Sequence, residues 1–268
     1  MVKLSAIIIS KDEEDVIETA LKSLKFADEV IVADSGSTDN TLKIAKKYAN
    51  KIVKTTGNSF GQWRNQAMQA AKGNWILYLD SDERIPPKLA REIVATINEP
   101  IHDAYTIPRY EVLLGKHLSH WPDPHVLRLM KKSSLVKWKG TLHEQPEIKG
   151  TVGKLREQMI HLTHRDFTAM IAKTSKWSIK EAILLKKAGH PKMVGWRFFR
   201  IIFTELFQRL IKQGLWKDGT EGVLEAIFLS FSRFFTYVRL WEMQREPSLD
   251  KTYKHIDKKI FEEWDKEG

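Results

Sequence analysis

Two aspartates separated by one residue follow an apolar run in the stretch WILYLDSDE, residues 75–83. The run is typical of a buried strand, and Asp80 and Asp82 stand at its end. Carboxylates at positions i and i+2 of an extended segment point the same way. They can share one hard divalent cation, Mg²⁺ or Mn²⁺, or one can bind the metal and the other a nearby hydroxyl. Water and a substrate diphosphate would complete the shell, and the metal would neutralise the charge of a leaving phosphate. An acidic turn that caps the next helix is the alternative interpretation.

Two further polar clusters, SKDEE (10–14) and ADSGSTD (33–39), also follow apolar runs. Runs typical of strands occur at residues 4–9, 29–34, 51–54 and 75–79, and helical periodicity occurs at 16–24, 42–49, 60–72 and 87–97. This alternation predicts an α/β fold with a mostly parallel sheet and helices on both faces. Ligands bind such sheets at the carboxyl ends of the strands, where all three clusters are expected.

The remainder of the chain changes character twice. Short strand-like pieces, expected to be antiparallel, occupy residues 103–165, and helical patterns follow over residues 166–268. We therefore expect a catalytic domain over 1–165, with a donor half (1–102) and an acceptor half (103–165), and then a C-terminal amphipathic helical region.

Bulky apolar residues alternate with Arg and Lys in segments 195–216 and 222–241. Charges interrupt each segment within a few residues, so neither is a clean membrane span. The pattern is typical of helices that lie in a membrane interface with cations on anionic headgroups. Packing on the catalytic domain or a homodimer interface are the alternatives.

The amino-acid composition and net charge limit the kinds of molecule that the protein can bind. The chain has 268 residues, 42% of them hydrophobic, and no cysteine, which excludes disulfides and thiolate chemistry. The net charge of +10 suggests an anionic partner, either nucleic acid, nucleotide phosphates or a membrane face. Acidic clusters at the strand ends oppose binding of nucleic acid there. The N-terminal apolar stretch is too short for a signal peptide, so we expect a cytoplasmic protein.

The segments SAIIISKDEEDVIETALKSLKFADEVIVADSGSTDNT and RNQAMQAAKGNWILYLDSDE resemble the nucleotide-sugar-binding half of family 2 glycosyltransferases of the GT-A fold. WKGTLHEQ, LTHRD and residues 206–240 extend the resemblance over nearly the whole chain. The subgroup is similar to bacterial lipopolysaccharide-core β-1,4-glucosyltransferases. This resemblance implies inverting transfer of a hexose, glucose, from a UDP-sugar to a core heptose or a similar lipid-linked glycan, at the inner face of the cytoplasmic membrane.

The resemblance assigns the nucleoside site to the first two clusters. It implies that Asp12 and Glu13 meet the nucleoside, that Asp34 accepts a hydrogen bond from uracil, and that Ser35 and Asp39 flank this pocket. The family usually has Asn where Asp12 stands, which affects a detail of nucleoside contact. Capping of the local turns is the structural alternative for Asp34 and Asp39.

The resemblance also assigns the diphosphate and metal sites. It places Arg64 and Asn65 near the base and diphosphate. It implies that Asp82 is the direct metal ligand and that Asp80 binds the ribose or a metal-bound water. His164 is the candidate third metal ligand, and a neutral imidazole suits Mn²⁺ better than Mg²⁺. A solvated helix charge at Arg64 and a structural role for His164 are the alternatives.

Inverting transfer needs one carboxylate that removes the acceptor proton while an oxocarbenium-like transition state forms. The candidate general base is Glu144 in TLHEQ, where His143 could orient it, and Asp123 is the second choice. Arg128 is a candidate phosphate ligand. A polar turn is the alternative interpretation of the His-Glu pair.

Two other functions fit parts of the sequence. A sugar-nucleotide pyrophosphorylase would carry a Gly-rich, cationic phosphate loop after the first strand, where this chain has SKDEE. A non-catalytic scaffold that binds nucleic acid or membranes is permitted by the charge. Stabilisation by UDP and Mn²⁺ would distinguish an enzyme from that scaffold.

Overall fold

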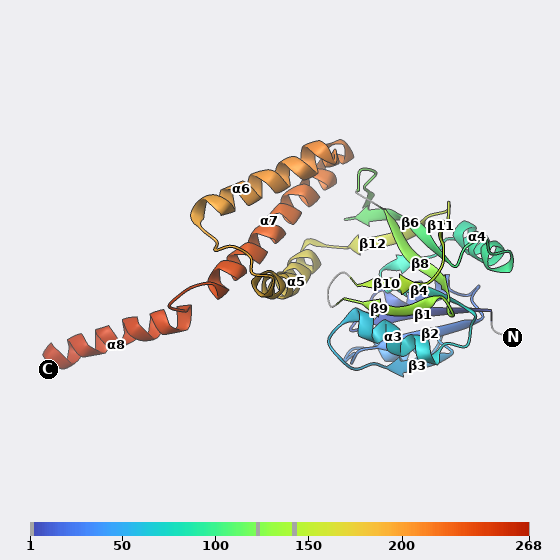
Figure 1. Cartoon of the computed structure of the whole chain (residues 1–268), viewed down its shortest axis with the longest axis horizontal. Helices are drawn as coiled ribbons and strands as arrows, with labels where there is room; N and C mark the ends of the chain where they lie inside the picture. The colour runs from blue at the N-terminus through green and yellow to red at the C-terminus, as the bar shows by residue number, and fades with distance from the viewer. Residues whose placement is uncertain (1–2, 122–123, 141–143, 268) are drawn as a thin grey trace. The chain divides into compact units, whose positions relative to one another are not determined.

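The computed structural model describes residues 3–121, 124–140 and 144–267 (Figure 1). The chain divides into two compact units, Met1–Arg165 and Asp166–Gly268. The first unit contains every strand of the described chain, and the second is helical.

Four parallel strands form the first part of the sheet, in the order β3-β2-β1-β4. They are β1 (Leu4–Ser10), β2 (Glu29–Asp34), β3 (Lys51–Lys54) and β4 (Trp75–Asp80). Every residue of β1 and β2 is buried, which explains why these strands read as continuous apolar runs and not as alternating ones.

The sheet continues from β4 through β8, β6 and β12 to β5. These strands are β8 (His125–Lys131), β6 (Ala104–Leu113), β12 (Met159–His164) and β5 (Glu83–Arg84), while β7 (Lys116–His117) and β11 (Val152–Lys154) pair with β6. The antiparallel expectation is correct for β6, β7 and β8 and wrong for β11 and β12, which run parallel to β6. The long connections after β6 return the chain to the same end of the sheet, as parallel pairing requires.

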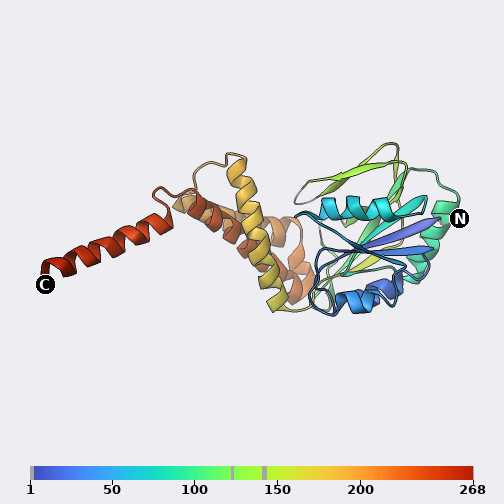
Figure 2. The same cartoon turned by 90° about the horizontal axis from the view of Figure 1, so that it is seen from below.

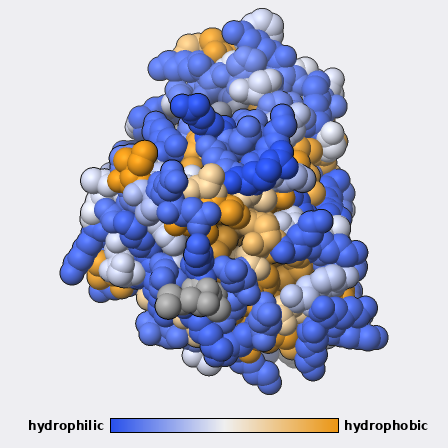
Figure 3. All heavy atoms as spheres, turned by 90° about the vertical axis from the view of Figure 1, so that its right-hand side faces the viewer, coloured by the Kyte–Doolittle hydropathy of each residue, from blue (hydrophilic) through white to orange (hydrophobic). Residues whose placement is uncertain are grey.

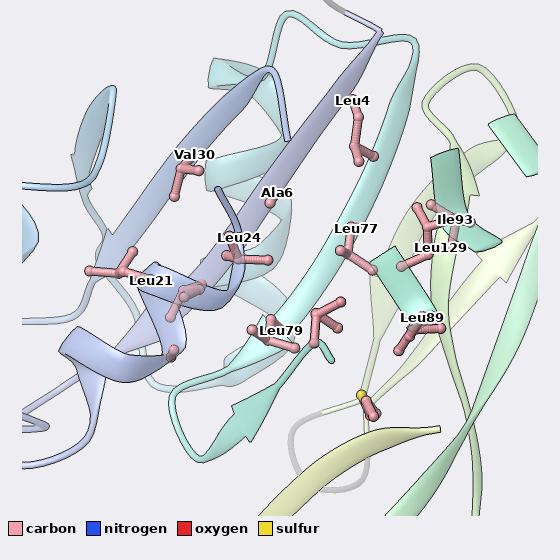
Figure 4. Close-up of a cluster of buried hydrophobic side chains, with 14 of the residues drawn as sticks. Leu4, Ala6, Leu21, Leu24, Val30, Leu77, Leu79, Leu89, Ile93 and Leu129 are labelled. Carbon is pink, nitrogen blue, oxygen red and sulfur yellow. The ribbon is translucent and has the colours of Figure 1, made fainter. Parts of the chain in front are cut away.

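Helices cover both faces of this sheet, as the sequence predicts. One face packs against α1 (Ile17–Ser23), α2 (Thr41–Ala45) and α4 (Pro87–Asn98) in a buried cluster that includes Leu4, Leu77 and Leu89 (Figure 4). The other face packs against α3 (Phe60–Ala70). The α/β fold with a mostly parallel sheet, flanking helices and C-terminal helices is therefore confirmed.

A separate two-stranded sheet, β9 (Leu135–Lys139) and β10 (Gln145–Ile148), packs beside α3. Gly61 makes the close approach possible, because a Cβ atom there would lie 3.2 Å from the carbonyl oxygen of Gly140. Asn65 fixes this contact, since its amide both accepts from and donates to the backbone of Trp138, at 2.8 and 3.1 Å. The β9–β10 sheet is thus held at a defined distance from α3.

The second unit is built from helices alone. They are α5 (Phe167–Lys187), α6 (Gly195–Leu206), a π-helical turn (Phe207–Lys212), a 3₁₀ turn (Leu215–Asp218), α7 (Gly219–Met243) and α8 (Leu249–Glu267). Both α5 and α6 pack against α7, and α6 runs alongside it (Figures 1 and 2). Within the described chain, none of the helices combines the length and the apolar character needed to span a bilayer.

The surface of the molecule is mainly hydrophilic in the view of Figure 3, where apolar side chains gather in a central strip. Patches of this kind are ordinary on soluble domains, because polar atoms cannot cover the whole surface. The largest exposed apolar side chains of the first unit are few among its described residues, Val94, Ile101, Tyr110, Val136 and Val152.

Candidate active site

The three polar clusters meet at one edge of the sheet, as the strand assignments predict. In the strand register, Ser10 at the end of β1 pairs with Asp34 of β2, and Ile9 pairs with Asp80 of β4. The end of β1 therefore lies between two aspartates. The strand order reverses at β1, and such a point is where ligands bind in α/β sheets.

The loops after β1 and β2 are joined to each other by hydrogen bonds. Asp12 has a left-handed backbone (φ 54°), and its Oδ1 accepts from the Thr38 N–H at 2.7 Å. The Glu13 N–H donates to Thr41 Oγ1 at 2.7 Å. The two loops therefore form one wall at the rim, and this wall contains the residues expected to meet a nucleoside.

Asp34 and Asp39 both cap local turns in this wall. The buried Asp34 carboxylate accepts from the backbone N–H groups of Gly36 and Ser37. Burial would raise the pKa of Asp39, but hydrogen bonds from Thr41 and from the Glu14 backbone hold it below the usual value. The capping that was the alternative interpretation is thus present.

Ser35 is tied to the neighbouring strand end. Its N–H donates to the Ser10 carbonyl at 3.1 Å, and its hydroxyl lies 3.4 Å from the same oxygen. Contacts of Ser35, Asp34 and Asp39 with a nucleoside stay predictions.

The segment after β4 is a turn, so the expectation of an extended segment is wrong. The chain turns at residues 81–82, and the Glu83 carboxylate closes the turn by accepting the Asp80 N–H at 2.9 Å. The carboxylates of Asp80 and Asp82 consequently have different partners. The roles of Asp80 and Asp82 toward a metal or a substrate stay predictions.

Asp80 is held by two arginines. One carboxylate oxygen lies 2.8 Å from Arg64 Nη2, and the other pairs with Arg128. Burial would raise the pKa of Asp80, but the charges of Arg128 and Arg64 outweigh it and keep the pKa well below its usual range. Asp80 is therefore ionised.

Arg64 connects Asp80 to Glu144. Its guanidinium pairs with both carboxylates and lies 4.5 Å from the ring centroid of Trp138. The side chain of Arg64 is only 4% exposed and that of Glu144 11%. Arg64 is thus a buried bridging cation and not a solvated helix charge, and the two candidate functional carboxylates meet on it.

Arg128 belongs to a series of neighbouring charged side chains that begins at Glu144, Arg64 and Asp80. Arg128 pairs with Glu83 at 2.8 Å, Arg109 lies 3.9 Å from the same Glu83 oxygen, and Arg109 Nε lies 2.8 Å from Glu111. Burial, with Asp80 nearby, raises the pKa of Glu83 in spite of Arg128. The charges alternate in sign along this series.

The series ends at Asp82. His161 of β12 lies between Glu111 and Glu83 in the strand register. Its Nδ1 is 2.6 Å from Glu111, and its Nε2 is 3.4 Å from Asp82. Burial would lower the pKa of His161, but the hydrogen bonds with Asp82 and Glu111 raise it to about 10. His161 is accordingly an imidazolium.

Sequence reasoning missed four members of this series: Glu83, Arg109, Glu111 and His161. The available signal was the RYE triplet inside a strand-like run, because charged residues are almost never fully buried without a partner. The histidine selected from the sequence, His164, ends β12, and its carbonyl accepts the Leu114 N–H at 3.0 Å. Asp123 and His143 lie outside the described residues.

The donor atoms fit a divalent ion in part. Across the described ranges, no three His, Asp or Glu side chains are grouped as a complete ligand set. Asp82 offers carboxylate oxygens and is 27% exposed, whereas both oxygens of Asp80 are engaged by arginines. The residues therefore fit an ion held by Asp82, with further oxygen ligands from water and a diphosphate.

The chain is similar to known glycosyltransferases. The family model described as glycosyl transferase family 2 matches residues 5–152. The lipopolysaccharide core biosynthesis glycosyltransferase LpsC of Rhizobium meliloti (strain 1021) is 25% identical, over 94% of this chain and 98% of its own. An uncharacterized glycosyltransferase, RC0292 of Rickettsia conorii, is 26% identical over 90% of each chain.

Two solved structures also resemble the chain. Staphylococcus aureus TarS 1-349 in complex with UDP-GlcNAc is 16% identical, with 92% of each chain covered and a TM-score of 0.47. Glucosyl-3-phosphoglycerate synthase from Mycobacterium tuberculosis, in complex with Mn²⁺, UDP-glucose and glycerol 3-phosphate, is 18% identical, with 50% of this chain and 58% of that chain covered and a TM-score of 0.39.

Proposed function

Since the chain belongs to glycosyltransferase family 2, we propose that it is an inverting enzyme that transfers a hexose, glucose in the first instance, from a UDP-sugar to a lipopolysaccharide-core heptose or a similar lipid-linked glycan. The observation that carries the proposal is the meeting of Glu144 and Asp80 on Arg64 at the rim of the sheet. Similarity over nearly the full length to a lipopolysaccharide core glycosyltransferase supports the acceptor class. Family membership favours catalysis over a binding scaffold.

Glu144 is the proposed general base. Its carboxylate removes the proton of the acceptor hydroxyl as that oxygen attacks the anomeric carbon and the bond to the diphosphate breaks. The proton ends on Glu144, and the leaving group is UDP. Arg64 pairs with the Glu144 carboxylate and thereby fixes its position at the rim.

The nucleoside and the diphosphate are proposed to bind along the rim of the sheet. The wall formed by the loops of Asp12 and Asp34 would receive uridine, and Arg64 and Arg128 would face the phosphates. Asp82 would hold Mg²⁺ or Mn²⁺, which neutralises charge on the leaving diphosphate. Asp80 orients the two arginines, because each of its oxygens is paired with one of them.

A lipid-linked acceptor would require the enzyme to work beside a membrane. We therefore include peripheral association with the inner face of the cytoplasmic membrane in the proposal. The mixture of aromatic and basic residues in the second unit supports this association.

Thermal unfolding with UDP and Mn²⁺, followed by transfer from a panel of labelled nucleotide sugars to truncated core acceptors, tests the proposal. UDP with Mn²⁺ should raise the unfolding temperature of the wild-type protein and of Glu144→Gln, but not that of Asp82→Asn. Glu144→Gln should abolish transfer while binding is kept. Absence of transfer from every UDP-sugar would refute the proposed function.

A further inference from the structure

A stripe of large apolar side chains runs along α6 and the two turns that follow it. Residues in this α6 stripe recur at mostly helical spacing and are each between 54% and 70% exposed, namely Trp196, Phe199, Phe203, Phe207, Ile211 and Trp216. We propose that the α6 stripe is the surface that binds an anionic lipid bilayer. The inference deepens the proposed membrane association by naming the residues that make the contact.

The opposite side of α6 already has its partners. Phe198 packs edge-to-face on Phe234 of α7, with ring centroids 5.7 Å apart. Ile201 packs against the small core formed by Ala182, Met193 and Leu240. The stripe is therefore the face of α6 left over after the helix has packed on α7. Six exposed large apolar side chains in one row differ from the scattered single residues that are ordinary on a protein surface, and such patches mark interaction sites.

Cations flank the stripe and contact its aromatic rings. The guanidinium carbons of Arg197 and Arg200 lie 5.2 and 5.4 Å from the centroid of Trp196. Lys212 and Lys217 lie over Phe207 and Trp216, each at 5.9 Å. Within the ranges the structure describes, none of these four cations has a carboxylate within 4.0 Å.

This combination matches the two layers of a bilayer surface. Aromatic rings and aliphatic groups can enter the boundary between headgroups and acyl chains, while Arg and Lys reach the lipid phosphates. Anionic lipid neutralises the four cations, and each cation near such a surface strengthens binding roughly fivefold.

Two other apolar stripes of the second unit differ in where their cations lie. On α8, which exposes Phe261 and Trp264, Lys254 pairs with Asp250 at 2.8 Å, and among the described residues no Lys or Arg lies over either ring. On α7, which exposes Leu224, Ile227, Phe231 and Phe235, Arg233 lies 3.5 Å from Glu181 and over the ring of Tyr237. Unpaired cations placed on exposed aromatic rings therefore favour the α6 stripe as the surface for anionic headgroups.

A second copy of the chain is a poorer occupant of the stripe. In a two-fold symmetric contact the same patch meets itself, so Arg197, Arg200, Lys212 and Lys217 would be brought toward the cations of the same patch on the other copy. Like charges at an interface oppose association, whereas lipid phosphates attract these side chains.

Sedimentation of the full chain with vesicles tests the inference. We expect binding to vesicles of phosphatidylethanolamine and phosphatidylglycerol, and little binding to phosphatidylcholine alone. Arg197→Gln with Arg200→Gln should weaken binding roughly 25-fold. Phe199→Ser with Phe203→Ser should weaken it on the order of a hundredfold, because two buried side chains are lost.

The matched control is Phe261→Ser with Trp264→Ser on α8, which removes comparable exposed apolar surface and should change binding by less than about twofold. Circular dichroism checks the folding of each variant. If Phe199→Ser with Phe203→Ser misfolds, the binding of Arg197→Gln with Arg200→Gln provides the test.

Unchanged binding in the α6 variants, or loss only in the α8 variant, would assign membrane binding to another face. No binding of the wild-type protein to any vesicle would overturn the inference altogether. Transfer to a soluble acceptor should stay unchanged in every variant, and its absence from the wild-type protein would count against the enzymatic proposal alone.

Discussion

Replacing Arg64 by methionine tests the buried charge bridge between Asp80 and Glu144. The methionine side chain preserves the apolar contact with Trp138 and removes the cation. Glu144, 11% exposed, then loses its partner, whereas Asp80 is 36% exposed and retains Arg128. Removing one member of a buried pair costs about 3–5 kcal/mol, so with a discount for the accessible Asp80 we expect a loss of about 2–4 kcal/mol of unfolding free energy.

A double-mutant cycle isolates the Arg64–Glu144 interaction. Glu144→Gln alone leaves Arg64 with Asp80, and we expect it to cost about 1–2 kcal/mol. If the two side chains interact, the double variant should be more stable than the sum of the single effects predicts, by about 1–3 kcal/mol. Urea unfolding followed by tryptophan fluorescence measures the four free energies. Additivity within about 0.5 kcal/mol would refute the bridge.

Three further outcomes follow from the site and the first unit. Asp80→Asn should lower the free energy of unfolding by about 1–3 kcal/mol, because it breaks two ion pairs. Asp82→Asn should lower it by less than about 1 kcal/mol. Equal losses in urea unfolding would contradict the separate partners of the two carboxylates. Gly61→Val should keep the UDP-induced thermal shift and reduce transfer about tenfold or more, because a Cβ atom at this position already lies 3.6 Å from Glu144 Cβ; unchanged turnover would contradict a role for this close approach. Hydrogen bonds from the Thr151 backbone and from Lys131 lower the pKa of Asp103. Its contribution to the stability of the fold is therefore present above about pH 4 and is lost as the pH falls through the lower pKa of the folded state. The wild-type protein should lose more stability on acidification than Asp103→Asn, and equal losses in acid titrations would exclude this contribution.

Local sequence patterns were sufficient for the donor half of the fold. Continuous apolar runs marked β1, β2 and β4, and the structure places Asp34 and Asp80 at the ends of β2 and β4. The periodic apolar positions of α4 and the proline at its start predicted that helix. These signals succeed because each depends on neighbours within a few residues.

Interactions between distant segments were not readable in the same way. The side chains of Glu83, His161 and Glu111 meet because β5, β12 and β6 align in one register, and no local pattern reports that register. The turn at residues 81–82 was considered only as the alternative to an extended segment, because it is closed by the Glu83 carboxylate, whose burial the local pattern does not report. The resemblance to a family supplied roles for residues, but not the charges that surround them.

The charges of the series from Glu144 to Asp82 bear on the proposal that a divalent ion helps to hold the diphosphate. The series from Glu144 to Asp82 contains five carboxylates, and it contains four cations when His161 is protonated. With all five carboxylates ionised, the series carries a net charge of −1, although the chain carries +10. Arg64 and Arg128 are already paired with carboxylates, so they cannot offer a diphosphate their full charge. A divalent ion at Asp82 would reverse the sign of the rim, which favours donor binding that requires the metal.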